Sequence, residues 1–492
     1  MNRCILAVDQ STQATKGLLF DKNGILIARA DRTHRQIINE QGWVEHDPLE
    51  IMQNVVGVCG DVLAKSGVAT TQVAAFAISN QRETSLMWDK ATGQPIHNAV
   101  VWQCARAVEI CERPEISIRA KVVCRKTGLN LSPYFPAAKL NWLMENVPAA
   151  KELAAQGRLA CGTIDSWIVW NLTGNHWTDY SNASRTQLFN IVDLNWDEEL
   201  CRLFSVPMGS LPQVHMSNDS FGETDIQGVL DHTVPIHGVL GDSHGALFGQ
   251  DCRRPGQMKC TYGTGSSVMM HIGDQPKFSD NGLVTSLAWG MDGKVEYVFE
   301  GNLNYTGAVI AWLKKDVGLI ATDMEATELA CAANPNDRAY FVPAFTGLGA
   351  PYWDSHAAGL LTGVTRTTGR AEIAKACLEC IAYQITDLVE LMARDSGLPV
   401  TALRVDGGPT ASRYLMQFQS DIAHIAVQVP ELEELSGMGA AYAAGVAVGL
   451  YDLGTVYERI QRLEYGPVME DDRRNVLYRG WKQAVRQTLT HD

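Results

Sequence analysis

The chain repeats one pattern in each half, two apolar strand segments joined by a polar turn. In the first half, residues 5–8 and 17–20 are apolar and flank the polar segment 9–16. The same order recurs in residues 257–272, around a Gly-rich turn at residues 263–267. Short apolar runs bounded by turn residues predict β-hairpins. Two such hairpins, one in each half, predict two related domains that face each other.

The length of the chain also indicates two domains. The chain has 492 residues, whereas a single hydrophobic core stops growing at roughly 250–300 residues. Apolar residues at helical spacing predict a helix over residues 48–66, and residues 73–79 form a further strand segment. Strands mixed with helices indicate an α/β layered fold. We place the boundary so that one domain covers residues 1–253 and the other covers residues 254–492.

The charge of the chain argues against two classes of partner. Lys and Arg number 41 and Asp and Glu number 55, which gives a net charge of −14. An acidic surface repels nucleic acid and anionic membranes, so neither is expected as a partner. The longest weakly polar run, residues 437–450, is also too short to span a bilayer.

Cysteine usage predicts a cytoplasmic protein. The 12 Cys residues are scattered along the chain, as in proteins that are kept in a reducing compartment. Cys377 and Cys380 have C-x-x-C spacing, but no second pair completes a zinc site, and buried free thiols are the preferred interpretation. Asp9 interrupts the only apolar stretch near the start, so no secretory signal is expected.

The polar turns are candidate phosphate-binding sites. Residues 9–16 combine backbone N–H groups, Thr hydroxyls and a Lys, and residues 263–267 offer the same groups without the Lys. Successive N–H groups in a tight turn bind anions, and Asp9 has the carboxylate that Mg²⁺ prefers beside phosphate oxygens. A third Gly-rich turn occupies residues 405–409. Each turn alone is compatible with an ordinary hairpin, and no P-loop motif is present.

Several polar and aromatic residues in apolar settings have two interpretations. Residues 80–83, Asn-Gln-Arg-Glu, directly follow a strand segment and are typical of a solvated loop. Trp102 and Tyr134 are individually typical of a core. Asp242 ends an apolar strand, where it caps a loop or acts as a general base.

A set of motifs resembles the FGGY carbohydrate kinases, and within that family the glycerol kinases. The similarity covers about residues 4–451. The motifs are VDQST (8–12), GWVEHDP (42–48), NQRET (80–84), VWQC (101–104), YFPAAK (134–139), DYSNASR (179–185), PAFTGLGAPYWD (343–354) and MQFQSD (416–421).

The resemblance implies a fold and a set of site residues. The fold would be α/β, with two ribonuclease-H-like domains of the actin and hexokinase type flanking a catalytic cleft. Asp242 would be the catalytic base for ATP-dependent phosphorylation, with Mg²⁺ near Asp9. The implied substrate contacts are Arg82, Glu83, Trp102, Tyr134 and Asp242, and the implied ATP contacts are Thr12, Gln13, Lys16, Thr264, Gly307, Gly408 and Ser412. A homo-oligomer, dimer or tetramer, is also expected.

The chain departs from the glycerol kinase pattern at the substrate side. Ser243 stands where these enzymes carry Gln, and Ser267 stands where they carry Phe. Two bulky residues have become two hydroxyls, which is either neutral change or the mark of a longer and more polar pocket. His244 also differs, and it either caps a helix or reaches the substrate. Lys16 replaces the usual Arg, which keeps the positive charge but loses the bidentate fork.

The sequence therefore predicts an ATP-dependent kinase that phosphorylates a primary hydroxyl of a small polyol or sugar. Glycerol is the nearest named substrate, and a four- to six-carbon polyol or ketose is the alternative within the class. The alternative from another class is a nucleotide-switch ATPase of the actin and heat-shock-chaperone type. Such a switch has no use for the polyol contacts implied for Arg82, Glu83, Trp102 and Tyr134.

Overall fold

The computed structural model describes residues 3–490 and contains two large sheets. The first sheet has the strand order β14 (Glu223–Thr224), β15 (Val234–Gly241), β6 (Val73–Asn80), β1 (Cys4–Gln10), β2 (Ala14–Phe20) and β3 (Leu26–Thr33). Strands β1, β2 and β3 are antiparallel neighbours, whereas β6 and β15 run parallel to β1.

The second sheet repeats this arrangement. Its order is β18 (Val284–Met291), β19 (Lys294–Leu303), β17 (Ser266–Gly273), β16 (Met258–Tyr262), β22 (Ala402–Asp406), β23 (Ala426–Pro430) and β24 (Arg462–Tyr465). Strands β16, β17 and β19 are antiparallel, and β22 and β23 run parallel to β16. The central strands of the two sheets therefore share one topology, which confirms the prediction of two related α/β domains.

Helix α1 (Pro48–Ser66) covers one face of the first sheet, as the sequence predicts. The Asp47 side chain caps its first turn, Pro48 occupies the first position, and Gly67 ends it in the left-handed conformation. Its buried side chains recur at helical spacing and include Ile51, Met52, Val55, Val58 and Val62.

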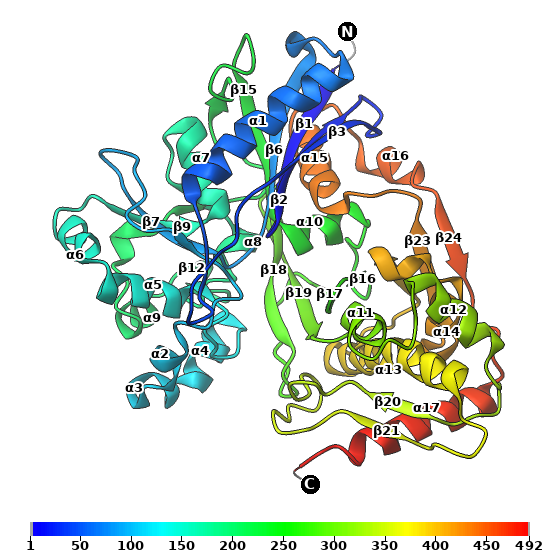
Figure 1. Cartoon of the computed structure of the whole chain (residues 1–492). Helices are drawn as coiled ribbons and strands as arrows, with labels where there is room; N and C mark the ends of the chain where they lie inside the picture. The colour runs from blue at the N-terminus through cyan, green and yellow to red at the C-terminus, as the bar shows by residue number, and fades with distance from the viewer. Residues whose placement is uncertain (1–2, 491–492) are drawn as a thin grey trace.

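Helices α10 (Asp242–Gly249) and α15 (Leu435–Ala447) lie between the two sheets (Figure 1). One apolar cluster contains residues of both helices and of both sheets, for example Leu18, Phe248, Met438 and Met269. Although α15 comes late in the chain, it packs on the first sheet. The two halves therefore share a core and are held together by it.

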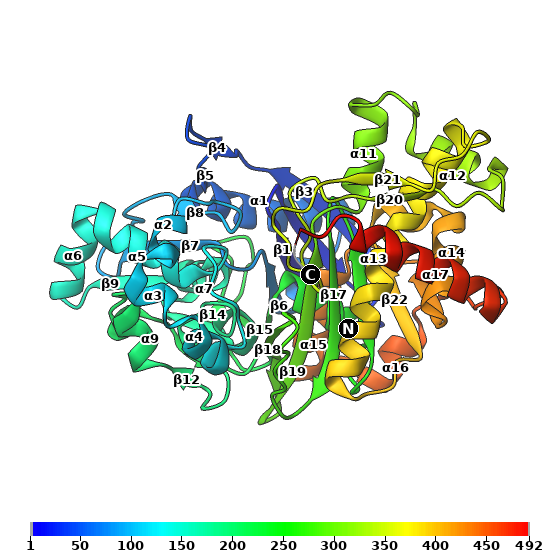
Figure 2. The same ribbon diagram turned by 90° about the horizontal axis from the view of Figure 1, so that it is seen from below.

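The remaining elements cover the outer sides of the two sheets (Figure 2). In the second half these are α11 (Gly307–Lys315), α12 (Asp323–Ala332), α13 (Arg370–Ser396), α14 (Arg413–Ala423), α17 (Asp471–Arg486), β20 (Tyr340–Val342) and β21 (Leu360–Thr362). Helix α16 (Leu453–Glu458) instead packs with α10 and α15 in the shared apolar cluster. Cys377 and Cys380 are buried free thiols in α13, as the preferred interpretation has it.

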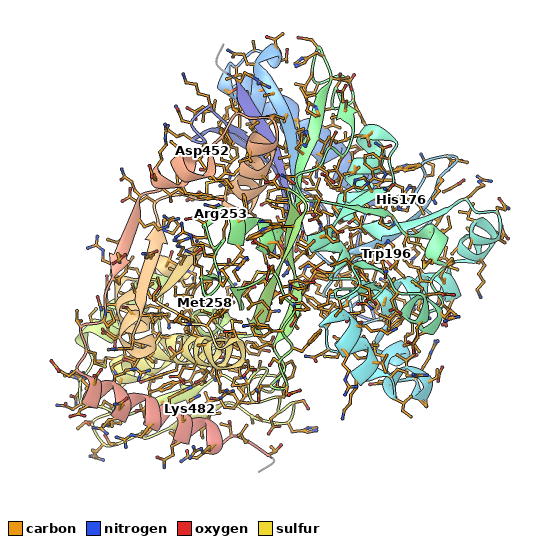
Figure 3. All side chains as sticks on the ribbon, turned by 180° about the vertical axis from the view of Figure 1, so that it is seen from behind. His176, Trp196, Arg253, Met258, Asp452 and Lys482 are labelled. Atoms are coloured by element: carbon orange, nitrogen blue, oxygen red, sulfur yellow. The ribbon has the colours of Figure 1, made fainter. Side chains whose placement is uncertain are left out.

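A side lobe extends the first half. It contains a sheet of β4 (Ile37–Ile38), β5 (Val44–His46), β8 (Ala99–Val100), β7 (Ser85–Asp89) and β9 (Leu159–Thr163), with α2 (Val108–Glu112), α3 (Pro114–Ser117), α4 (Ala120–Thr127), α5 (Pro136–Asn146), α6 (Pro148–Ala155) and α7 (Ile164–Thr173). Short elements then lead to β14: β10 (Trp177–Asp179), α8 (Tyr180–Ala183), β11 (Phe189–Asn190), β12 (Asn195–Trp196), α9 (Glu198–Leu203) and β13 (Gln213–His215). In Figure 3, His176 and Trp196 lie in this half and Met258 and Lys482 in the other.

The two polar turns are shorter than the sequence suggests. Strand pairing continues to Asp9 opposite Lys16 and to Gln10 opposite Thr15, so that the first turn contains only residues 11–13. In the second hairpin, Ser267 lies within β17, opposite Thr261. The sequence does not reveal these strand ends, because their residues are polar. Successive side chains of a strand point to opposite faces, and near the end of a strand they are no longer all covered by apolar residues. Among the described residues, no helix is both long and apolar enough to cross a membrane.

Glycines allow α10 and α15 to pack closely. A methyl group on Gly439 would overlap the carbonyl oxygen of Gly245, and one on Gly245 would lie 2.6 Å from the carbonyl oxygen of Ser436. We expect Gly439→Ala to push the helices apart and to cost about 1–3 kcal/mol, as overpacking does. Differential scanning fluorimetry should show the unfolding midpoint lowered by about 1–3 °C, since 1 kcal/mol shifts the midpoint of a chain of this length by only about 1 °C.

The matched control is Gly60→Ala in α1, because a methyl group there meets no atom within 4 Å. This change should raise stability by up to about 1 kcal/mol, since Ala favours the helix more than Gly does. Equal midpoints for the two variants would show that the α10–α15 contact does not limit stability.

Candidate active site

The carboxyl ends of three parallel strands bring the first group of expected site residues together. Asp9 lies near the end of β1, opposite Ser79 of β6, and Gly241 of β15 lies opposite Asn80. Arg82 lies two residues after the end of β6, and Asp242 follows β15 directly. In open α/β sheets, ligands bind outside this edge. The topology therefore explains why residues far apart in the sequence meet here.

The segment after β6 is buried, so its interpretation as a solvated loop is wrong. Asn80, Gln81, Arg82 and Glu83 are all 5% exposed or less. Glu83 has a φ of 63°, a left-handed conformation that is uncommon for a residue other than Gly. Buried polar groups are costly unless they are paired. The side chains of this segment must therefore have partners.

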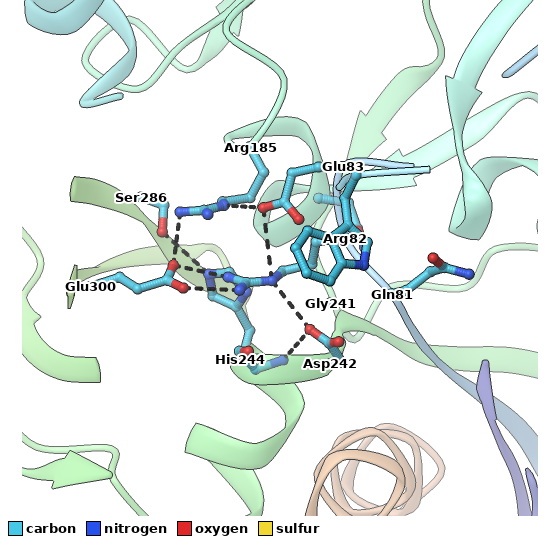
Figure 4. Close-up of polar contacts among 12 residues, drawn as sticks. Gln81, Arg82, Glu83, Arg185, Gly241, Asp242, His244, Ser286 and Glu300 are labelled. Atoms are coloured by element: carbon cyan, nitrogen blue, oxygen red, sulfur yellow. Dashed lines mark hydrogen bonds and ion pairs between the residues drawn. The ribbon is translucent and has the colours of Figure 1, made fainter. Parts of the chain in front are cut away.

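Arg82 and Glu83 belong to a buried ring of charges (Figure 4). Arg82 donates through Nη1 and Nη2 to the two carboxylate oxygens of Glu300, at 3.0 and 2.9 Å. Arg185 lies 2.8 Å from Glu300 through Nη1 and donates through Nε to Glu83 at 2.6 Å. Arg185 and Arg82 hold the pKa of Glu300 well below its usual range, against the effect of burial. Glu300 therefore keeps its negative charge between the two arginines.

The ring joins the two halves of the molecule. Glu300 lies on β19 of the second sheet, whereas Arg82, Glu83 and Arg185 belong to the first half. Sequence reasoning missed Glu300 as a site residue and gave Arg185 no role. The available signal was an acidic residue inside the apolar run Tyr297-Val-Phe-Glu300, since a buried carboxylate in a strand needs a partner.

Asp242 is the first residue of α10 and is partly open to solvent. Its Oδ1 lies 3.2 Å from Arg82 Nε, and its side chain is 36% exposed. The backbone N–H of Ser243 donates to the same oxygen at 2.6 Å. The side chain is thus fixed on one side and open on the other, an arrangement in which a carboxylate can accept a proton from a bound hydroxyl.

An aromatic pair lies at the same edge. The rings of Trp102 and Tyr134 are in edge-to-face contact, with centroids 5.5 Å apart. Trp102 Nε1 donates to the hydroxyl of Thr12 at 2.9 Å, which links this pair to the first hairpin turn. Burial raises the pKa of the Tyr134 hydroxyl far above its usual value, so it remains a hydrogen-bond donor. Lys139 donates to the Tyr134 carbonyl.

The two serines that depart from the glycerol kinase pattern lie in different places. Ser267 donates to Glu300 at 3.4 Å and therefore borders the ring of charges. Ser243 follows Asp242 at the start of α10 and is partly exposed. His244 is fully buried, with Nε2 3.3 Å from the Ser286 hydroxyl, and burial lowers its pKa well below the usual value. His244 therefore packs inside the protein as a neutral group.

Four of the expected nucleotide contacts line a cavity of about 790 Å³ in the second half. They are Thr264, Gly307, Gly408 and Ser412, and Trp312, Thr327 and Phe345 line it with them. The amide N–H of Gly307 donates to the carbonyl of Gly263 at 3.0 Å. A methyl group on Gly307 would lie 2.5 Å from that carbonyl oxygen, so this close approach requires glycine.

The other three expected nucleotide contacts lie on the first hairpin. Gln13 is exposed at the turn, and Thr12 accepts the bond from Trp102. Lys16 Nζ donates to Glu434 Oε2 at 2.6 Å and lies 3.8 Å from Asp9 Oδ2. The structure thus brings Lys16 close to Asp9, and it also gives Lys16 a partner, Glu434, that sequence reasoning missed.

The surroundings of Asp9 suit a hydrated Mg²⁺ that also binds phosphate. Asp9 is 5% exposed and accepts a hydrogen bond from Ser79 at 2.8 Å. Burial raises the pKa of Asp9 to about 6, and Lys16 and Ser79 oppose that rise. Within residues 3–490, no group of three or more His, Cys, Asp and Glu side chains gathers as a metal site. One carboxylate with waters and substrate phosphates is the ligand set that Mg²⁺ commonly uses in kinases.

Comparisons with known proteins agree with this geometry. The N-terminal and C-terminal domain models of the FGGY family of carbohydrate kinases match residues 4–249 and 258–448. A glycerol kinase of Caldanaerobacter subterraneus is 44% identical over 99% of both chains, and one of Symbiobacterium thermophilum is 45% identical over 98% of both. The crystal structure of Plasmodium falciparum glycerol kinase with ADP superimposes with a TM-score of 0.94 at 34% identity, and covers 100% of this chain and 99% of the other.

These matches confirm the predicted fold class and the predicted ATP-dependent phosphotransfer to an alcohol group of a polyol or sugar. They do not favour the alternative of a nucleotide-switch ATPase. Both family models match in the expected order, and the relatives align over nearly their whole length. The chain therefore belongs to the FGGY family of carbohydrate kinases.

Proposed function

We propose that the enzyme transfers the terminal phosphoryl group of ATP to a primary hydroxyl of a small polyol or sugar, with Asp242 as general base. The observation that carries this proposal is the position of Asp242. Its carboxylate is fixed by Arg82 at 3.2 Å, is 36% exposed, and lies at the edge where β1, β6 and β15 end. The relatives named glycerol kinase support a polyol as acceptor.

In this mechanism Asp242 accepts the proton of the attacking hydroxyl. The hydroxyl oxygen forms a bond to the γ-phosphorus, and the bond from that phosphorus to the bridging oxygen breaks, which releases ADP. Asp242 then loses the proton to water. A positioned base contributes roughly 10²–10⁴-fold to such a step, and most of the remaining acceleration comes from positioning and charge stabilisation.

The residues around Asp242 orient the acceptor. Two N–H groups of Arg82 are bound by Glu300 and one faces Asp242, which leaves about two of its five N–H donors for substrate hydroxyls. Glu83 accepts hydrogen bonds from the substrate, and Tyr134 donates one. Trp102 provides the apolar wall behind the substrate carbons. Arg82 and Glu83 are buried, and the partly buried rings of Trp102 and Tyr134 pack against each other. This supports the assignment, because fixed side chains orient a ligand without losing side-chain freedom.

The nucleotide lies against the second sheet. Gly307, Gly408 and Ser412 contact the nucleoside and Thr264 a phosphate, because all four line the same cavity. Thr12, Gln13 and Lys16 contact the terminal phosphate from the first hairpin. Asp9 would hold Mg²⁺, which would neutralise charge on the phosphates.

The acceptor is proposed to be larger than glycerol, a polyol or ketose of four to six carbons. Ser243 beside the base and Ser267 beside Glu300 are small and carry hydroxyls, whereas the resemblance leads one to expect Gln and Phe. Loss of two bulky side chains makes room for further carbons, and the hydroxyls pair with further substrate hydroxyls.

The setting of the enzyme follows from its composition. We propose a cytoplasmic enzyme, since all 12 cysteines are free and most of them are buried. A homo-oligomer, dimer or tetramer, is proposed, which light scattering in solution tests. The domains are proposed to divide at residues 253/254, and nucleic acid is not a proposed partner, because the net charge is −14.

Asp242→Asn should lower kcat by about 100-fold or more, because an amide cannot accept the proton. The affinity for ATP, measured by titration calorimetry, should stay unchanged, and circular dichroism should confirm the fold. Arg82 would keep its partner Glu300 in this variant, so that the ring of charges is preserved. A kcat reduced less than about tenfold would assign the proton transfer to another group.

The substrate-size proposal predicts a higher kcat/KM for at least one four- to six-carbon polyol or ketose than for glycerol. The double variant Ser243→Gln with Ser267→Phe should shift the preference toward glycerol by about 10–200-fold, the range set by filling methylene-sized space. The measurement compares glycerol, erythritol, pentitols and common ketoses. If glycerol is the best wild-type substrate by a wide margin, the pocket is not enlarged.

A further inference from the structure

Lys16 belongs to a row of alternating charges across the first sheet. Pairing places Lys16 of β2 opposite Asp9 of β1 on one side and opposite Asp31 of β3 on the other. Directly paired residues project from the same face of a sheet. The row therefore runs negative, positive, negative on the face that α15 covers.

Glu434 lies at the start of α15 and completes this row. Its Oε2 accepts a hydrogen bond from Lys16 Nζ at 2.6 Å, and its Oε1 lies 2.5 Å from Nη1 of Arg29. The Glu434 side chain is only 5% exposed, whereas Lys16 is 24% and Arg29 36% exposed. The Glu434 carboxylate is thus buried between two cations, Lys16 and Arg29. Of these two side chains, Lys16 is the less exposed.

The backbone at Glu434 is specialised for this contact. Its φ of 65° and ψ of 37° are left-handed, a conformation that costs free energy for any residue with a side chain. Glu434 precedes the first residue of α15, but its side chain forms no capping hydrogen bond with the helix. The surrounding structure therefore holds Glu434 in a strained backbone conformation, in which its carboxylate contacts Lys16 and Arg29. Strained residues of this kind cluster at functional sites.

The first turn of α15 fixes the position of Glu434 relative to Asp9. A methyl group on Gly437 would overlap Leu18 and would lie 3.4 Å from the Cβ of Asp9, so the helix start lies directly against β1 and β2. The segment between β23 and α15 carries Glu434 from the second sheet to the first. A residue of the nucleotide half thus reaches the phosphate turn of the other half.

We propose that Glu434 is a positioning residue that holds the Lys16 ammonium beside Asp9, so that its remaining N–H groups face the terminal phosphate of ATP. This inference rests on the proposed function, in which Lys16 contacts that phosphate. A lysine ammonium has three donors on a flexible stem, and one carboxylate leaves two of them for the ligand. A fixed ammonium binds without first losing its side-chain freedom. An arginine presents its N–H donors in a rigid planar group, whereas a lysine does not. By fixing the Lys16 ammonium, Glu434 therefore compensates for this difference.

The test compares the affinities of a non-hydrolysable ATP analogue and of ADP, by calorimetry with Mg²⁺, in four full-length variants. These are Lys16→Met, Glu434→Gln, the double variant, and Arg29→Gln as the matched control. Arg29→Gln removes the outer cation from the same carboxylate but leaves the contact with Lys16. Thermal unfolding is followed in parallel, and KM for the polyol shows whether the acceptor site is intact.

Lys16→Met should weaken binding of the ATP analogue about tenfold or more, because a hydrogen bond to a charged group contributes at least that factor to an affinity. Glu434→Gln should weaken it at least about threefold, with little change for ADP, and should add nothing in the Lys16→Met background. Arg29→Gln should leave the ratio of the two affinities unchanged.

The outcomes separate two kinds of failure. If Lys16→Met leaves the ATP analogue's affinity unchanged, the proposed placement of the terminal phosphate is wrong. If Lys16→Met weakens binding while Glu434→Gln tightens it, Glu434 competes with the phosphate and the positioning role is overturned. Equal losses for ATP analogue, ADP and polyol in Glu434→Gln, with a lowered unfolding midpoint, would assign the residue to docking of α15 alone.

Discussion

The ion pair between Arg82 and Glu300 determines how the two halves of the active site meet. Glu300 comes from the second sheet and Arg82 from the edge of the first, and both are buried. Removing two charges from water costs several kcal/mol per ion, so a buried pair is stable only where further hydrogen-bond or ion-pair partners offset this cost. Arg185 and Glu83 supply them, and Asp242 lies on the remaining edge of the Arg82 guanidinium. The position of the proposed base therefore depends on a contact between the sheets.

Local sequence patterns predict much of the fold and the positions of several site residues. Apolar residues at helical spacing predict α1 over residues 48–66, as the structure has it, and the two hairpins indicate the repeated topology. Asp9 lies near the end of a buried strand, and Arg82 and Asp242 come just after the ends of two others. Each of these positions can be recognised from its own local sequence. Their meeting at one edge follows from the parallel order of β1, β6 and β15. Motifs of the family added the residues that line the nucleotide cavity.

What sequence reasoning missed depends on contacts between distant segments. Glu300 acquires its role because two arginines from the other half reach it, and Glu434 because α15 crosses to the first sheet. Neither contact has a local pattern, since the partners are separated by more than a hundred residues. The burial of residues 80–83 was missed for the same reason, because polar side chains after a strand are usually solvated. A paired charge can be distinguished from a solvated one only once its partner is known.

We infer that the ring of charges positions Asp242 and the acceptor, and that the nucleotide cavity forms independently of this ring. Steady-state kinetics and ATP calorimetry on the folded Glu300→Gln variant test it most directly, since this change keeps the shape of the side chain and removes its charge. We expect kcat/KM for the polyol to fall about 100-fold or more, because a small misplacement of the reacting groups costs that much. The affinity for ATP should stay within about twofold, because that cavity is lined by other residues. A folded Glu300→Gln variant that retains the wild-type kcat/KM would show that the charge of Glu300 does not position Asp242 or the acceptor.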